Sequence, residues 1–490
     1  MGIVIKQSVK NLVFTYIGFA IGALNTLVLY QKFMTPEYYG LVNVLLSVAM
    51  IMFPLLSFVM ASGVNRFYPI NKKKNQQGEL LFVSLLFPLI VSSIAAVFFY
   101  TFLDDINNVL SDRSILMKSF TGYLFLFGFF FGMFEVFYSI SKVQLRSVWG
   151  NILKEIFIRV VVSILLIALY FELITEHDFI VLLLISYGVR VVIMGVDALK
   201  PVYKDIKFKL PDNYREIISF SLFILMASSV LLLVFEIDKF MVSQMIDLSN
   251  VAYYSVATFV GIVVAAPGRS IHQILNPLFA REFADKNMAK VEELFKKGSL
   301  NLILISGYIF LLITLNSASM FSFLEGEYAG GERVTFYIGL ANLVLMSAIG
   351  TNSIMSNSGY YKYDLLFGFL LFGLTISLNY LFIPIYGIDG AAMATATTLI
   401  IYTTLRLTLI WYLLKIHPFT KKSLKSILVI FLVYVFVNEF VVVDNEIVSI
   451  LIRSSIITTI LAIYVYVFKP SDEVDSMLKS VISKIKDRLS

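Results

Sequence analysis

The feature that most constrains this chain is a succession of apolar runs, each roughly 20 residues long. A helix needs about that length to cross the roughly 30 Å hydrocarbon core of a bilayer. The expected spans are residues 11–33, 38–62, 80–103, 115–140, 152–171, 179–199, 217–245, 251–277, 299–323, 334–357, 363–384, 388–414, 424–443 and 448–468. The sequence therefore predicts an all-α polytopic membrane protein with about 14 transmembrane helices.

Composition indicates the same class of protein. Hydrophobic residues make up 59% of the 490 positions and charged residues 15%, whereas a soluble domain has roughly 45–50% and about 25%. The chain has no cysteine, and its three histidines do not stand in a metal-ligand spacing. We therefore expect no disulfide, no metal and no cofactor. The net charge of +6 does not indicate nucleic-acid binding, because the basic residues gather in short loops.

The distribution of charge predicts the orientation of the chain. If the N-terminus is cytoplasmic, the loops around 66–74, 142–154, 200–215, 281–297 and 415–425 face the cytoplasm and are rich in lysine and arginine. The intervening loops are acidic and hold few basic residues, and this asymmetry of lysine and arginine is what the positive-inside rule predicts. Both termini are then cytoplasmic. Every loop is shorter than the roughly 50 residues of a small domain, so we expect no catalytic residues and no enzyme, and function must lie within the helices.

Pairs of matching residues about 215 positions apart predict an internal repeat. The pairs are Tyr38-Tyr39 with Tyr253-Tyr254, Arg66 with Arg281, Lys200 with Lys415, Arg190 with Arg406, and Pro54 with Pro267. We therefore expect two pseudo-symmetric six-helix halves, residues 1–210 and 211–420, which rock around a central site. Two additional transmembrane helices (421–470) and a cytoplasmic amphipathic tail (471–490) follow. A chance alignment of similar hydropathy is the alternative.

Three motifs resemble those of a known transporter family. They are Met34-Thr-Pro-Glu-Tyr-Tyr-Gly40, Ile237-Asp-Lys-Phe240 with Val251-Ala-Tyr-Tyr-Ser255, and Pro384-Ile-Tyr-Gly-Ile-Asp-Gly-Ala-Ala392. The chain thereby resembles the polysaccharide-transport branch of the MOP (MATE-like) superfamily, which includes the O-antigen (Wzx-type) flippases. The motifs are structural turns, so they specify the family better than the substrate.

The resemblance implies a function in polysaccharide and lipopolysaccharide biosynthesis. A member of this branch would flip undecaprenyl-pyrophosphate-linked oligosaccharide across the bacterial cytoplasmic membrane, coupled to an H⁺ or Na⁺ gradient rather than to ATP. The implied partners are this substrate, membrane lipids, and a polysaccharide polymerase and ligase. The alternatives are a MATE-like small-molecule or multidrug exporter and a lipid II flippase. Lipid II flippases carry basic residues in their first span, and none lies between Lys10 and Lys32 here.

Ionisable side chains inside the spans are the candidate functional residues, because each costs roughly 2.5–3.5 kcal/mol on insertion scales. Four arginines are expected in the cytoplasmic halves of their spans, where guanidinium groups could bind the pyrophosphate: Arg159, Arg190, Arg269 and Arg406. Asn25 is a candidate for binding sugar hydroxyls, and it could equally join two helices.

Three carboxylates are the candidates for ion coupling, and they are Asp238, Glu236 and Glu135. Structural roles remain open for all these charges. Glu155 and Arg159 stand at i, i+4 and could neutralise each other. Arg190 and Arg269 could extend to the inner headgroups, and Asp238 could pair with another span. His272 lies one turn from Arg269, and we expect it to be a solvated or packed histidine rather than part of a proton relay.

Overall fold

A computed structural model describes residues 2–110, 115–324, 326–360, 362–476 and 479–480. Every regular element within these ranges is a helix, so the predicted all-α fold is confirmed. The chain divides into two compact units, Met1–Ala252 and Tyr253–Ser490. This division places helix α11 with the first unit. The predicted repeat boundary at residues 210 and 211 stays a prediction.

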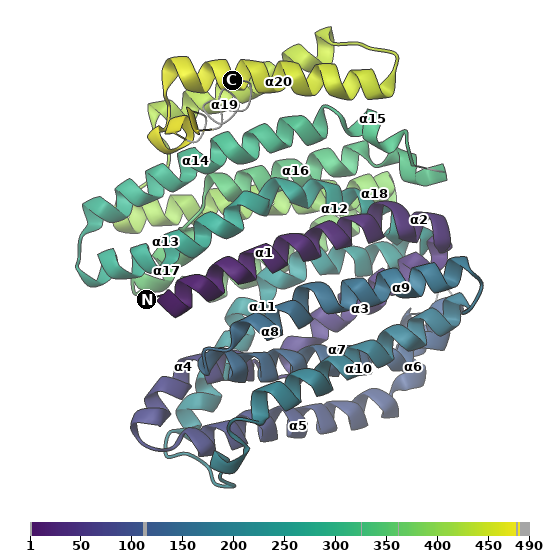
Figure 1. Ribbon diagram of the computed structural model, residues 1–490, viewed down its shortest axis with the longest axis vertical. Helices are drawn as coiled ribbons and strands as arrows, with labels where there is room; N and C mark the ends of the chain where they lie inside the picture. The colour runs from purple at the N-terminus through teal and green to yellow at the C-terminus, as the bar shows by residue number, and fades with distance from the viewer. Residues whose placement is uncertain (1, 111–114, 325, 361, 477–478, 481–490) are drawn as a thin grey trace. The chain divides into compact units, whose positions relative to one another are not determined.

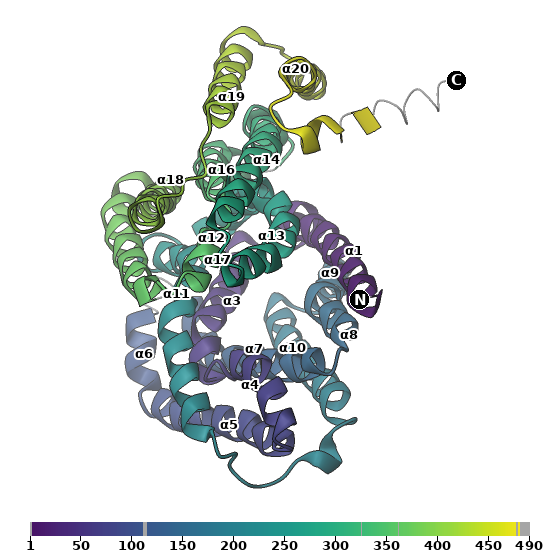
Figure 2. The same ribbon diagram turned by 90° about the vertical axis from the view of Figure 1, so that its left-hand side faces the viewer.

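The first unit is built around helix α7, which contacts α3, α4, α5 and α10 (Figure 2). Buried side chains of α4, α5, α7 and α10, among them Phe67, Leu80, Phe134 and Met194, form its core. The helices of this unit are α1 (Gly2–Leu24), α2 (Tyr30–Phe33), α3 (Pro36–Leu56), α4 (Met60–Lys73), α5 (Gln77–Thr101), α6 (Leu103–Leu110), α7 (Ile115–Val143), α8 (Ser147–Ile152), α9 (Ile158–Tyr170), α10 (Glu176–Leu199) and α11 (Tyr214–Met245).

The second unit is built around helix α14, which contacts α13, α16, α19 and α20 (Figure 1). Phe310 and Leu311 of α14 pack against Val437 of α19 and Ile457 of α20. The helices are α12 (Ser249–Ile262), α13 (Ala266–Ala284), α14 (Met288–Thr314), α15 (Ser317–Phe321), α16 (Glu332–Ser347), α17 (Thr351–Asn357), α18 (Lys362–Leu414), α19 (Lys421–Phe440) and α20 (Glu446–Phe468).

Ten of the described helices are long and apolar enough to cross a bilayer, and the bent pair α16–α17 would make eleven. The predicted number of fourteen therefore stays a prediction. One difference is α18, which contains two predicted spans joined without a loop through Gly387. Another is the run from α8 to α9, which carries Lys154, Glu155 and Arg159 close together. The last is α11, which covers the predicted span 217–245 but is not among the ten.

Several helices are broken where the sequence places proline. Helix α3 ends two residues after Pro54, and Phe58 and Val59 then adopt positive φ values of 50° and 47°. Helix α12 ends in a single 3₁₀ turn, and Pro267 lies in the first turn of the following α13. Both prolines belong to the matched pairs of the predicted repeat. A proline inside a helix removes a backbone hydrogen bond, which accounts for the end of α3 after Pro54, whereas the first turn of a helix tolerates proline, as in α13.

The beginning of the predicted tail packs against the second unit. Residues 472–476 are helical, and Val474 contacts a cluster that contains Leu300, Leu304, Tyr464 and Val465. Ser471 Oγ also donates to Asn301 Oδ1 at 2.5 Å. Residues 477–478 and 481–490 lie outside the described residues, so the predicted amphipathic helix over 471–490 is described only at its start.

Candidate functional site

The run from α1 to α2 contacts the run from α8 to α9, and each run contains one π-helical segment. These segments are η1 (Asn25–Leu29) and η2 (Leu153–Phe157). The helices approach closely because glycines face the contact: a Cβ on Gly18 would collide with the Glu155 carbonyl, and one on Gly22 would lie 3.2 Å from Arg159 Nε. Single π turns within α-helices are frequent at functional sites, so this contact is the first place to examine.

Asn25 joins the two helices with both ends of its amide. Its Nδ2 donates to the Arg159 carbonyl at 2.8 Å, and its Oδ1 accepts from Ser163 Oγ at 2.6 Å. The side chain is buried, with 3% exposed. In this arrangement Asn25 acts as the helix-joining residue that the sequence left as an alternative to sugar binding.

Arg159 pairs with a carboxylate on its own helix. Its Nη1 lies 3.5 Å from Glu155 Oε2, and one third of its side chain is exposed. The i, i+4 pair considered from the sequence is therefore present.

Arg190 differs from the other arginines because aromatic rings surround it. It lies on α10 with 4% of its surface exposed. Its Cζ lies 4.2 Å from the centroid of the Phe134 ring, 4.6 Å from that of Tyr187 and 5.3 Å from that of Phe131. Within the described chain, no carboxylate oxygen lies within 4.0 Å of it, and its Nε has no hydrogen-bond partner.

The surroundings of Arg190 make it receptive to an anion. Cation–π contacts offset part of the cost of burying a guanidinium, by about 2 kcal/mol when desolvated. A buried charge without an ion-pair partner retains most of its desolvation cost. A ligand oxyanion that reached the unsatisfied nitrogen would supply both a hydrogen bond and an opposite charge.

Glu135 on α7 forms an ion pair with Lys154 from the π-helical segment η2, with Oε1 and Nζ 2.5 Å apart. About a fifth of the Glu135 side chain is exposed. Lys142, two turns further along α7, lies over the Tyr138 ring at 4.3 Å. Glu135 is thus already neutralised by a cation, which an incoming proton or metal ion would have to displace.

The two remaining candidate carboxylates lie on α11. Asp238 is fully buried. Glu236 accepts a hydrogen bond from Ser47 Oγ of α3 at 2.6 Å and pairs with Lys239 at 3.2 Å. Lys239 thus pairs with the carboxylate one turn earlier on the same helix. The α11 cluster is thus anchored to α3 through Glu236.

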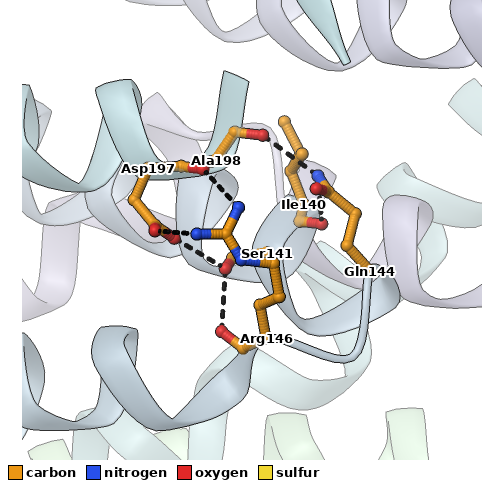
Figure 3. Close-up of polar contacts among 6 residues, drawn as sticks. All are labelled: Ile140, Ser141, Gln144, Arg146, Asp197 and Ala198. Carbon is orange, nitrogen blue, oxygen red and sulfur yellow. Dashed lines mark hydrogen bonds and ion pairs between the residues drawn. The ribbon is translucent and has the colours of Figure 1, made fainter. Parts of the chain in front are cut away.

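Sequence reasoning missed a polar clamp at the ends of α7 and α10 (Figure 3). Arg146, expected as a loop residue, forms an ion pair with Asp197 of α10 and donates to its carbonyl at 3.2 Å. Ser141 Oγ bonds both the Arg146 carbonyl, at 2.8 Å, and Asp197 Oδ2, at 3.0 Å. Gln144 donates to the Ala198 carbonyl at 3.0 Å. The signals in the sequence were Arg146 after an apolar run and Asp197 inside the predicted span 179–199.

The two arginine candidates of the second unit differ in their environment. Arg406 is buried, donates to the Tyr402 hydroxyl and pairs with Asp364 at 2.6 Å. Arg269 on α13 is exposed, and the structure records no ion pair for it among the described residues. His272, one turn on, lies 2.9 Å from Asn276; the contact joins His272 Nδ1 to the amide nitrogen of Asn276. Arg406 therefore has an ion-pair partner, and Arg269 has none among the described residues.

Comparison with known proteins identifies the family. Residues 6–281, more than half of the chain, match the family model described as polysaccharide biosynthesis protein. The chain belongs to this family. The match covers residues 6–252 of the first unit, including the π-helical contact, Arg190 and α11. The sequence matches no curated protein.

Solved structures show that the fold is that of the MOP superfamily. The chain is similar to the lipid II flippase MurJ in an inward closed conformation, with a TM-score of 0.72 and 16% identity over 93% of this chain and 98% of that one. It is also similar to a multidrug resistance MATE-family transporter in its inward-facing conformation, with a TM-score of 0.61 and 13% identity over 81% and 94%. The outward-facing conformation of a MATE-family transporter gives 0.58 and 13% over 84% and 96%. The resemblance stated from the sequence motifs is confirmed.

Proposed function

We propose that this protein flips an undecaprenyl-pyrophosphate-linked oligosaccharide from the inner to the outer leaflet of the bacterial cytoplasmic membrane. The family, which is one of polysaccharide biosynthesis, and the fold, which transporters share, support this proposal. The substrate is amphiphilic: a polar headgroup must cross the apolar core while the prenyl chain stays in lipid. Alternating access allows such a headgroup to pass without exposing it to hydrocarbon.

Arg190 is the observation that carries the proposal. A pyrophosphate offers several anionic oxygens in the geometry that a guanidinium binds best. Arg190 offers a fixed charge, an unsatisfied Nε and no carboxylate oxygen of the described chain within 4.0 Å. We assign it the capture of the pyrophosphate, with the partly exposed Arg159 as a second contact. An exporter of cationic compounds would need an anionic site instead.

The arginines of the second unit have lesser roles in this proposal. Arg269 is available to an anion because it is exposed. Arg406 already binds Asp364 and Tyr402, so it would have to exchange a partner in order to bind substrate. Asp238, Glu236 and Glu135 are the proposed coupling carboxylates, and Glu236 and Glu135 would take part only if Lys239 and Lys154 moved away from them.

Complementation of a strain that lacks the gene tests the proposal. We expect the deletion to remove surface glycan and to accumulate lipid-linked precursor on the cytoplasmic face. Arg190→Gln should fail to restore the glycan, with export reduced at least about tenfold because a charge-assisted contact contributes roughly 1.5–3 kcal/mol. Arg215→Gln, which removes an exposed arginine outside the expected spans, is the control at matched expression.

The outcomes separate the competing functions. Normal glycan in the deletion strain itself, with increased sensitivity to toxic cations, would favour a small-molecule exporter. Rescue of a strain depleted of its lipid II flippase would favour that substrate. Full glycan export by Arg190→Gln would keep the flippase and eliminate Arg190 as its phosphate site.

A further inference from the structure

Helix α18 carries an open apolar groove that the proposed transport does not use. Gly387 has φ 57° and ψ −134°, outside the helical region, and it divides α18 into a first arm (362–386) and a second arm (388–414). The groove between the arms has a volume of about 420 Å³. Its walls are apolar and aromatic, and they include Leu366, Phe367 and Leu370 of the first arm and Leu405, Leu409 and Trp411 of the second.

The groove lies at the ends of the helix rather than at its middle. Its lining runs from Tyr363 to Leu370 and from Leu405 to Tyr412, which is two turns, or about 10 Å, along each arm. The first arm begins at Lys362 and the second ends at Leu414. If α18 crosses the membrane twice, the groove lies directly beneath the headgroups of the leaflet that contains the two ends of α18. It then occupies the third of the roughly 30 Å hydrocarbon layer that is nearest to those headgroups.

Cations stand at the mouth of the groove. Lys415, which directly follows the second arm and has φ 58°, places its Nζ 5.2 Å from the Tyr412 ring centroid and 5.8 Å from that of Trp411. Both rings line the groove. Lys362 is exposed at the start of the first arm. Neither lysine forms an ion pair with another described residue.

The acidic group nearest to the groove in sequence is already neutralised. Asp364 pairs with Arg406 at 2.6 Å, behind the wall formed by Phe367, whose ring lies edge-on to Tyr402 at 5.8 Å. The two lysines therefore leave an uncompensated positive charge beside the apolar groove, which could hold one hydrocarbon chain. An amphiphile with an anionic head and an acyl tail complements both features.

We propose that the groove of α18 binds an anionic phospholipid of the surrounding leaflet, with one acyl chain between the arms and its phosphate on Lys415. The bound lipid would fill the space between the two arms, which contact each other through the Arg406–Asp364 pair. It would thereby fix the angle at Gly387. The proposal is independent of which substrate the protein carries.

Tryptophan fluorescence tests the proposal because the chain contains only two tryptophans. In a Trp149→Phe background, Trp411 reports on the groove. The protein is reconstituted in phosphatidylcholine vesicles that contain a small fraction of brominated phosphatidylglycerol or brominated phosphatidylcholine. We expect several-fold stronger quenching of Trp411 by the anionic lipid at equal mole fraction.

Matched lysine variants separate this site from general attraction of anionic lipid. Lys415→Gln should equalise the quenching by the two lipids. Lys469→Gln should leave the preference unchanged, because Lys469 likewise follows a helix with positive φ but that helix is α20, whereas Lys415 lies against the Tyr412 and Trp411 rings of the groove. Equal quenching by both lipids, or a preference that survives Lys415→Gln, would overturn the proposal. Displacement by trace undecaprenyl phosphate, but not by phosphatidylglycerol, would also overturn it and assign the groove to a prenyl chain.

Discussion

At the scale of the residue, three buried or half-buried arginines are stabilised by three different kinds of partner. Arg406 is bound by the carboxylate of Asp364. Arg453 donates to the backbone carbonyls of Val441 and Leu315, at the ends of α19 and α14, where unpaired carbonyls and the helix dipole favour a cation. Arg190 is packed against the faces of the Phe134 and Tyr187 rings. Only the last arrangement leaves the charge without an anionic or carbonyl partner, which is why we assign ligand binding to Arg190.

The Arg406–Asp364 pair should behave as a structural unit. Removing one partner of a buried ion pair destabilises a protein by about 3–5 kcal/mol, whereas replacing both by apolar residues is often neutral. We expect Asp364→Leu to lower the melting temperature in detergent, and Asp364→Leu with Arg406→Met to restore much of the loss. Export by this stable double variant would show that Arg406 does not bind substrate. Export lost at normal stability would return Arg406 to the site.

Asn25 should matter for the packing of α1 more than its single side chain suggests. Hydrogen bonds between membrane helices contribute on average about 0.6 kcal/mol each, so Asn25→Ala should cost roughly 1 kcal/mol through its two contacts. Asn43 is the matched control, because its amide donates within its own helix, to the Tyr39 carbonyl at 2.9 Å. Thermal unfolding of the two alanine variants decides the matter. Equal melting temperatures would contradict the helix-joining role.

At the scale of the element, hydropathy could predict the helices, and it could not predict their breaks or neighbours. The apolar runs are local, so their positions follow from the sequence. The contact of Asn25 with the Arg159 carbonyl joins residues 134 positions apart, and the Arg146–Asp197 pair joins residues 51 apart. Periodicity gives the face on which such a residue lies, but only the packing of the helices gives its partner. The charge cluster in η2 likewise gave no signal of a π-helical segment.

Gly18 is required at the contact between α1 and η2 because the two helices lie too close together for a Cβ atom, and not because of its backbone conformation. Gly18→Ala would press a methyl group onto the Glu155 carbonyl, and we expect a loss of about 1–3 kcal/mol from overpacking together with reduced export. Gly373→Ala is the control in another helix, where no atom lies within 4 Å of the added Cβ. Alanine should there be neutral or stabilising by about 0.5–1 kcal/mol. Similar melting temperatures for the two variants would contradict the close approach.

At the scale of the whole molecule, the number of membrane crossings decides the orientation of every site. The predicted arrangement has fourteen spans and cytoplasmic termini, whereas length and composition alone identify ten or eleven described helices. Part of the difference between fourteen and ten or eleven spans comes from α18, which gives two spans only if the chain reverses its direction at Gly387. The loop at Ser358 and Gly359 is short enough that sequence alone could not show where one span ended and the next began.

The absence of native cysteine makes the crossings directly measurable. Single cysteines at Lys74, Lys362 and Lys415 should react with a membrane-impermeant maleimide only after the cells are opened, because the positive-inside rule places these positions in the cytoplasm. Cysteines at Glu172, Asp444 and Tyr386 should react in intact cells. Tyr386 is decisive, since it is exposed beside the Gly387 kink. Labelling of Tyr386 from the same side as Lys362 and Lys415 would mean that α18 does not cross twice, and both the fourteen-span arrangement and the placement of the α18 groove beneath one leaflet would be wrong.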